Sequence, residues 1–262
     1  MSAHFEFDMG GAESIAVNMP DRETLSRTVR DRLRGSEGFA LATINLDHLV
    51  KLRTSERFRQ SYAAQDLVVA DGNPIVWLSR MASKPVALAP GSDLVVPLAR
   101  IAAENGVSVA LLGATAPVLA AAAAALKAQI PGLEVAAELA PSQNFDPEGA
   151  EADTLLAALK DSGAGLTLLA LGAPRQETFA ARGRKALPGM GFVSIGAGLD
   201  FLAGTQTRAP AWVRGLALEW LWRMLSNPRR LAGRYLRCIM ILPRLVVMAL
   251  RQRRADAPKA SA

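Results

Sequence analysis

TLLALGAPRQE, residues 167–177, is the stretch that decides the fold. An apolar, β-favouring run ends at Gly172, and Arg175, Gln176 and Glu177 follow a proline. An apolar run that stops at a glycine is typical of a buried parallel strand that delivers its C-terminal end to a loop. Because open α/β sheets bind ligands outside these strand ends, the polar cluster is expected to face a polar, phosphate-bearing ligand. The alternative is a helix start whose Arg175 and Glu177 are solvated.

Strands and helices alternate along the first 204 residues. Strands are expected over residues 14–17, 39–45, 67–70, 107–112, 133–137, 166–171 and 191–195, and helices over residues 21–34, 47–64, 74–81, 92–105, 117–129, 147–160 and 178–187. This order predicts an α/β fold with a doubly wound, mostly parallel, Rossmann-like sheet that carries helices on both faces. The chain contains no GxGxxG and no GxxxxGK[ST] sequence, so neither Rossmann-type dinucleotide binding nor P-loop hydrolysis is supported.

Composition narrows the class of protein further. Half of the 262 residues are hydrophobic, which allows a sizeable core. The single cysteine, Cys238, excludes an internal disulfide and is compatible with a reducing compartment. With only His4 and His48 and no DxD pair, neither a Cys/His zinc site nor a metal-dependent nucleotide-sugar site is indicated. The sequence suggests no signal peptide and no membrane-spanning helix.

Charge divides the chain into two parts. Residues 205–262 hold 12 basic and 2 acidic residues, a net charge of +10, whereas the other 204 residues hold 18 basic and 22 acidic residues, a net charge of −4. A basic segment of this kind favours nucleic acid, an anionic membrane surface or a phosphate-rich substrate. We therefore predict a body over residues 1–204 and an Arg-rich helical appendage over residues 205–262 with a disordered end.

The apolar residues of the appendage could bind a membrane surface or another subunit. A helix is expected over residues 212–225, and the apolar stretch 238–250 that follows is interrupted by Pro243 and Arg244. That stretch is too short and too charged to span a bilayer, but it suits an interfacial segment on a membrane. The alternative is an interface with another subunit.

Three side chains stand at the ends of two successive expected strands, residues 39–45 and 67–70. Thr43 and Asn45 end one strand, and Asp71 ends the next, just before Gly72. A carboxylate held on a sharp turn suits a general base, and the glycine allows close approach of the backbone. The alternative is that Asp71 caps the helix that begins at Pro74.

Glycines and arginines supply candidate ligand-binding groups elsewhere. In SIGAGLDFLAG, residues 194–204, the glycines permit a nucleotide to approach the backbone, and Asp200 could accept a hydrogen bond from a ribose or a base. The alternative there is a strand, a turn and a helix with a satisfied Asp200. Arginines of the appendage can bind phosphate through two parallel hydrogen bonds, although such a charge run is usually a solvated face.

Nine short motifs follow one another in a recognisable order between about residues 40 and 236. They are TIN at 43–45; ADG at 70–72 with Pro74; GSD at 91–93; LG at 112–113; GAPRQE at 172–177; GAGLDF at 196–201 with AG at 203–204; RAP at 208–210 with Trp212; EW at 219–220 with Arg223; and PRRL at 228–231 with RY at 234–235. In these motifs the chain resembles the WecG/TagA/CpsF family of bacterial glycosyltransferases, glycosyltransferase family 26.

The resemblance implies an activity and partners. It implies an inverting, metal-independent hexosyltransferase without a cofactor, which moves N-acetylmannosamine, its uronic acid or a related hexose from a UDP-sugar to a sugar linked to a polyprenyl diphosphate. The reaction would serve cell-surface polysaccharide synthesis, and the protein would lie in the cytoplasm, peripheral on the inner face of an anionic membrane. A homo-oligomer is left open, and no nucleic acid partner is expected.

The resemblance also implies roles for single residues. Asp71 would be the general base, and Thr43 and Asn45 would contact substrate near the reacting centre. The donor would be bound by Gly113, Arg175, Gln176, Glu177, Gly198, Asp200, Arg223, Arg230 and Arg234.

Two other classes of protein remain open from the residues alone. A nucleic-acid-binding module could carry a basic tail of this charge, although no known reading motif accompanies it. A nucleotide-binding protein of the same fold without catalysis is the second alternative.

Overall fold

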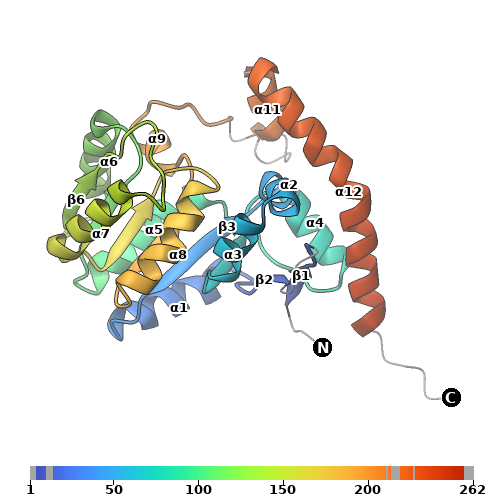
Figure 1. Cartoon of the computed structure of the whole chain (residues 1–262), viewed down its shortest axis with the longest axis horizontal. Helices are drawn as coiled ribbons and strands as arrows, with labels where there is room; N and C mark the ends of the chain where they lie inside the picture. Colours follow the sequence, from blue (N-terminus) through green and yellow to red (C-terminus); the bar gives the residue numbers. More distant parts are fainter. Residues whose placement is uncertain (1–3, 10–13, 211, 214–218, 227, 257–262) are drawn as a thin grey trace.

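A six-stranded parallel sheet forms the centre of the molecule (Figure 1). The computed structural model of the chain describes residues 4–9, 14–210, 212–213, 219–226 and 228–256. In spatial order, the strands are β4 (Leu67–Ala70), β3 (Phe39–Ile44), β8 (Gly191–Ser194), β7 (Leu166–Leu169), β5 (Val109–Leu112) and β6 (Val135–Leu139). All neighbouring pairs are parallel, so the C-terminal ends of β3, β4, β7 and β8 meet at one edge.

Helices cover both faces of the sheet because its central strands are apolar on both sides. One face packs against α1 (Arg22–Arg34), α5 (Gly91–Glu104), α6 (Ala116–Gln129) and α9 (Gly198–Leu202). The other face packs against α7 (Ala150–Ser162) and α8 (Arg175–Ala186), and α3 (Glu56–Ala63) packs on α8. Successive residues of β7 enter opposite layers, since Leu168 belongs to the first core and Leu169 to the second. This is the predicted Rossmann-like α/β fold.

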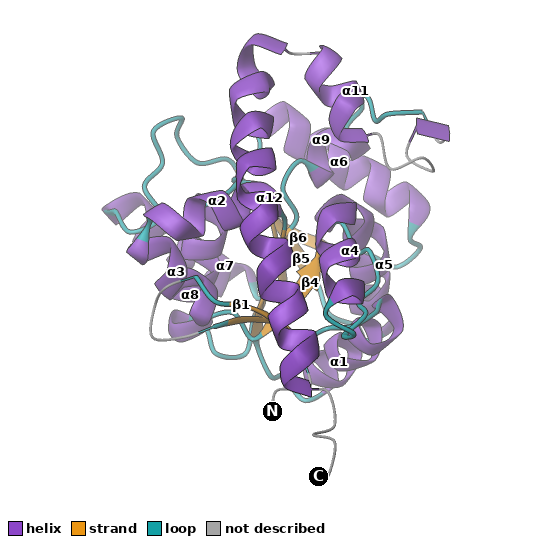
Figure 2. Ribbon diagram, turned by 90° about the vertical axis from the view of Figure 1, so that its right-hand side faces the viewer, coloured by secondary structure: helices purple, strands orange, loops and turns teal. Residues whose placement is uncertain are grey.

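A third core lies beyond the β4 edge of the sheet. It is built by α2 (Leu46–Thr54), α4 (Asn73–Met81), the antiparallel pair β1 (Phe5–Phe7) and β2 (Ile15–Val17), and the long C-terminal helix α12 (Pro228–Asp256). Figure 2 shows α12 in front, running between α2 and α4. A shorter helix, α11 (Glu219–Ser226), packs on α12, with the rings of Trp220 and Tyr235 edge to face at 5.8 Å.

Helix α12 is apolar on two opposite sides. Ile241, Leu245 and Ala249 are buried in the third core with Phe5 and Phe7. On the opposite side an exposed apolar stripe, flanked by exposed arginines, faces away from the body. We define the stripe as Leu236, Ile239, Met240, Pro243, Val247 and Leu250, flanked by Arg237, Arg244 and Arg251.

The far end of α12 is tied to the body by polar contacts. Gln252 donates to the backbone oxygen of Glu6 at 2.5 Å, and its own Oε1 accepts from the Glu6 N–H at 3.3 Å. Lys84 and Asp256 form an ion pair at 2.9 Å. The C-terminal helix expected from the sequence is therefore present and docked on the body.

The structure corrects several local expectations. Residues 47–64 form two helices rather than one, because the Ser55 side chain accepts a hydrogen bond from the Phe58 N–H and begins α3. Helix α12 continues through Pro243, which lies on the exposed side, where solvent can satisfy the freed carbonyl. Strand β1 was not expected. Helix α9 follows β8 and a turn, as the alternative interpretation of residues 194–204 had it.

Two expectations about the appendage fall partly or wholly outside the described ranges. The helix expected over residues 212–225 includes residues 214–218, and the disordered end includes residues 257–262, which the structure does not describe. Within the ranges given above, no helix combines the length and the hydropathy needed to cross a membrane.

Candidate functional site

The ends of β3 and β4 place Asn45 and Asp71 side by side. The Asn45 Nδ2 donates a hydrogen bond to Asp71 Oδ2 at 3.2 Å. The Asn45 Oδ1 accepts from the His48 N–H at 3.0 Å, so Asn45 is also the N-cap of α2. Because the cap uses the oxygen of the amide, the nitrogen is left to face the carboxylate. Two residues predicted at the reacting centre are thus brought together.

The backbone after Asp71 turns sharply at Gly72. Gly72 has φ +104°, a conformation that residues with a side chain rarely adopt. It is Gly72, not Asp71, that occupies the N-cap position of α4. The interpretation of Asp71 as a helix cap is therefore wrong, and its carboxylate belongs to the strand-end cluster with Asn45.

Buried polar groups hold the C-terminal end of β3 through hydrogen bonds. The Tyr62 hydroxyl donates to the backbone oxygen of Thr43 at 3.1 Å and lies 2.7 Å from His48 Nδ1. Since the tyrosine proton goes to Thr43, His48 Nδ1 donates to the tyrosine oxygen. Burial, together with the charge of Lys51, lowers the pKa of His48 to about 3, so the imidazole is neutral. Thr43 itself is only 3% exposed, and this network fixes its backbone.

Gln176 and Glu177 lie at the start of α8, beyond the end of β7. Gln176 Nε2 donates to Glu177 Oε1 at 2.8 Å, and Gln176 Oε1 accepts from the Gly196 N–H at 3.2 Å, which ties the loop after β7 to the loop after β8. Glu177 is fully buried. Burial raises its pKa to about 7, although the hydrogen bond from Gln176 and the charge of Lys51 act in the opposite direction. The solvated interpretation is wrong for Glu177.

Arg175, in contrast, is exposed. Its Nη1 donates to the backbone oxygen of Gln143 at 3.4 Å, which links α8 to the loop after β6. The alternative of a solvated arginine at the helix start therefore describes Arg175 correctly.

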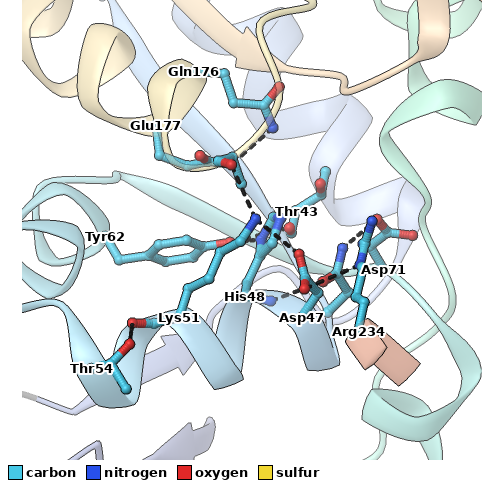
Figure 3. Close-up of polar contacts among 12 residues, drawn as sticks. Thr43, Asp47, His48, Lys51, Thr54, Tyr62, Asp71, Gln176, Glu177 and Arg234 are labelled. Atoms are coloured by element: carbon cyan, nitrogen blue, oxygen red, sulfur yellow. Dashed lines mark hydrogen bonds and ion pairs between the residues drawn. The ribbon is translucent and has the colours of Figure 1, made fainter. Parts of the chain in front are cut away.

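A charged cluster that the sequence analysis missed joins α2 to α12 close to Asp71 (Figure 3). Asp47 Oδ2 pairs with Lys51 Nζ at 2.9 Å, and Asp47 Oδ1 pairs with Arg234 Nε of α12 at 3.1 Å. Lys51 Nζ also donates to the backbone oxygen of Ala173 at 3.0 Å. The i,i+4 spacing of Asp47 and Lys51 was visible in the sequence. The contact with Arg234 needs the fold.

The charges in this cluster set the ionisation of Asp47. Burial acts to raise the pKa of Asp47, but the hydrogen bond from Lys51 and the charges of Arg234 and Lys51 outweigh it, so the pKa lies below its usual value. Asp47 is therefore an anion that holds one cation from the body and one from the appendage.

Three predicted donor-binding residues lie elsewhere along the strand ends. A Cβ on Gly113, whose φ is +122°, would come within 2.6 Å of the backbone carbon of Ala170. A Cβ on Gly198 would come within 2.6 Å of Val95 Cγ2. Asp200 accepts a hydrogen bond from the Thr205 hydroxyl at 3.4 Å. The contacts of these residues are thus local packing and turn contacts, and their predicted roles stay predictions.

The predicted arginines of the appendage are described unequally. Arg234 is placed as given above. The side chains of Arg223 and Arg230 lie outside what the structure describes, although their backbones belong to α11 and α12.

A second polar cluster joins motifs that are far apart in the sequence. The Arg208 guanidinium donates to Ser92 Oγ at 2.6 Å and to Asp93 Oδ1, and its centre lies 5.1 Å from the Phe201 ring centroid. Arg22 pairs with the other oxygen of Asp93 at 2.9 Å. This cluster fastens the beginning of the appendage to α5.

No group of three or more His, Cys, Asp or Glu side chains that could hold a metal ion occurs in the part of the chain described. The strand ends instead hold a carboxylate with an amide partner, Asp71 with Asn45, and Figure 3 shows Asp71 close to the pair of Asp47 and Arg234.

Comparisons with known proteins place the chain near one family of enzymes. Residues 13–258 match the model of the "Glycosyl transferase WecG/TagA/CpsF family". A curated relative from Bacillus spizizenii, named N-acetylglucosaminyldiphosphoundecaprenol N-acetyl-beta-D-mannosaminyltransferase, is 28% identical over 224 residues, which cover 85% of this chain and 82% of the relative.

Proposed function

The chain belongs to the WecG/TagA/CpsF family of glycosyl transferases, and we propose that it moves a sugar from a UDP-sugar to a sugar carried on a polyprenyl diphosphate, for a bacterial cell-surface polysaccharide. The first candidate for the transferred sugar is N-acetylmannosamine, because the Bacillus spizizenii relative is named for that transfer. Its uronic acid and related hexoses are the next candidates. The observation that carries the proposal is the Asn45–Asp71 pair at the strand ends.

The proposed reaction is a single displacement with inversion at the anomeric carbon. Asp71 takes the proton of the acceptor hydroxyl while the hydroxyl oxygen forms its bond to C1 of the donor sugar. The bond between C1 and the diphosphate oxygen breaks, and its electron pair leaves with UDP. Asn45 holds the Asp71 carboxylate in place through the bond at 3.2 Å.

The leaving UDP carries negative charge that needs a counterpart. Arg234, with Arg223 and Arg230, is proposed to supply it, because a guanidinium binds phosphate through two parallel hydrogen bonds. The sequence holds no DxD pair. We therefore propose that the reaction proceeds without a divalent metal.

The exposed apolar stripe of α12 supports a peripheral position on the inner face of the membrane. Met240 is 70% exposed and Leu236 is 59% exposed, which is unusual for large apolar side chains. The stripe is flanked by Arg237, Arg244 and Arg251. An apolar strip with basic flanks matches the chemistry of an anionic bilayer surface, where each basic residue contributes about 1 kcal/mol.

The test is a screen of UDP-sugars against a lipid-diphosphate-linked N-acetylglucosamine acceptor. Release of UDP and an inverted anomeric configuration in the product, determined by NMR, are expected for one donor. Tight UDP binding without turnover would instead favour a non-catalytic nucleotide-binding protein. Salt-sensitive binding to oligonucleotides without UDP binding would favour the nucleic-acid alternative.

A further inference from the structure

Asp47 lies between two helices that are far apart in the sequence, α2 and α12. It lies in the first turn of α2, two residues after Asn45, and its side chain is only 12% exposed. One carboxylate oxygen pairs with Lys51 at 2.9 Å and the other with Arg234 at 3.1 Å. Figure 3 shows Asp47 between these two cations.

Lys51 extends the connection to the loop before α8. Its ammonium group donates to the backbone oxygen of Ala173 at 3.0 Å. Ala173 lies three residues before Gln176, whose amide in turn binds the Gly196 N–H. The Asp47 carboxylate thus links α12, α2 and the loop between β7 and α8 within one small cluster.

A largely buried carboxylate costs free energy unless cations compensate it. The apolar contacts of Ile241, Leu245 and Ala249 already hold the middle and far part of α12 on the body. At the Arg234 end, α12 makes an ion pair with Asp47 of the body. An ion pair with a largely buried carboxylate thus joins this end of the helix to α2.

We propose that Asp47 is a positioning residue that docks the Arg234 end of α12 beside the Asn45–Asp71 pair and thereby sets Arg234 for the donor diphosphate. The docking part stands on the geometry alone. The part that concerns the donor rests on the proposed function.

Cys238 provides a direct readout of docking. It is the single cysteine of the chain, it lies one turn after Arg234 on the buried side of α12, and it is 5% exposed. Its rate of labelling by a maleimide therefore reports how often this part of α12 leaves the body. Because the measurement needs no sugar nucleotide, it remains informative if the proposed function fails.

The variants are Asp47→Asn and Arg234→Gln, which break the same ion pair from opposite sides. Each is expected to accelerate labelling by about 5–30-fold, and the double variant by no more than the faster single one. The matched control is Asp256→Asn, which removes the other ion pair between α12 and the body, with Lys84 at 2.9 Å. The control is expected to label within about twofold of the parent chain.

The two variants separate docking from electrostatics. The charge of Asp47 raises the pKa of the Cys238 thiol, and the charge of Arg234 lowers it, on top of the rise caused by burial. If charge alone mattered, Asp47→Asn would accelerate labelling and Arg234→Gln would slow it. That outcome, or unchanged labelling in Asp47→Asn, overturns the proposal.

Kinetics test the part that concerns the donor. Asp47→Asn is expected to raise KM for the UDP-sugar about 10-fold while kcat changes less than about 3-fold, and Asp47→Glu to restore most of the KM. Faster labelling with an unchanged KM would show a structural role only and would overturn the donor part. Absence of turnover in the parent chain would refute the proposed function and leave the labelling result standing.

Discussion

Asn45 bridges the first turn of α2 and the carboxylate of Asp71, accepting from the His48 N–H at 3.0 Å and donating to Asp71 Oδ2 at 3.2 Å. One side chain therefore begins a helix and also orients the proposed base. This double use couples the local stability of α2 to the geometry of the reacting centre.

Replacing Asn45 separates these two tasks. Asn45→Ala should lower the free energy of unfolding by about 1 kcal/mol, because it removes an N-cap, and should also lower turnover. Asn45→Asp retains a good cap but sets a second carboxylate against Asp71, which should raise the pKa of the base and shift the pH–rate profile upward. Urea unfolding and pH–rate profiles check both. An Ala variant with the stability and turnover of the parent chain would contradict the double role.

Glu177 should make stability depend on pH. Its pKa is about 7 in the folded chain against 4.5 for an ordinary glutamate, so the folded state holds a proton that the unfolded state loses between these values. Stability from this group is full below pH 4.5 and is lost as the pH rises to 7, by on the order of 3 kcal/mol. Glu177→Gln should flatten this decline in urea unfolding series from pH 4.5 to 8. An equal decline in both chains would show that Glu177 is not its source.

The two apolar sides of α12 should respond differently to substitution. Leu245 is buried in the third core, so Leu245→Ala should destabilise the chain by about 2–5 kcal/mol. Met240 is exposed, so Met240→Glu should change stability by less than about 0.5 kcal/mol but weaken sedimentation with anionic liposomes. Liposome binding that survives Met240→Glu combined with Val247→Glu would refute the membrane role of the stripe.

Chelation tests the proposed metal independence. Excess EDTA should leave the rate of UDP release unchanged, because arginines are proposed to neutralise the leaving diphosphate. A rate that falls with EDTA and returns with Mg²⁺ or Mn²⁺ would require a metal in the mechanism.

Local patterns predicted the sheet and its polar edge well. Apolar runs ending at Asn45, Asp71 and Gly172 predicted parallel strands, and parallel strands place their C-terminal ends at one edge whatever their order. The pairing of Asn45 with Asp71 then requires that β3 and β4 be neighbours, which they are.

Features that depend on distant partners could not be predicted in this way. Glu177 looks like a surface residue of a first helical turn, and only the packing of α8 on the sheet buries it. Asp47 and Arg234 lie near opposite ends of the chain, so no local spacing reveals their contact.

The most direct test of the account is the turnover of Asp71→Asn. The substitution keeps the shape of the side chain and removes its basicity, so the rate of sugar transfer from the UDP-sugar to the lipid-linked acceptor should fall by about 10²–10⁴-fold. Binding of UDP, measured by calorimetry on the same preparation, should stay within about 3-fold of the parent chain, because the arginines are untouched. A variant that transfers sugar at nearly the parent rate would show that Asp71 is not the base.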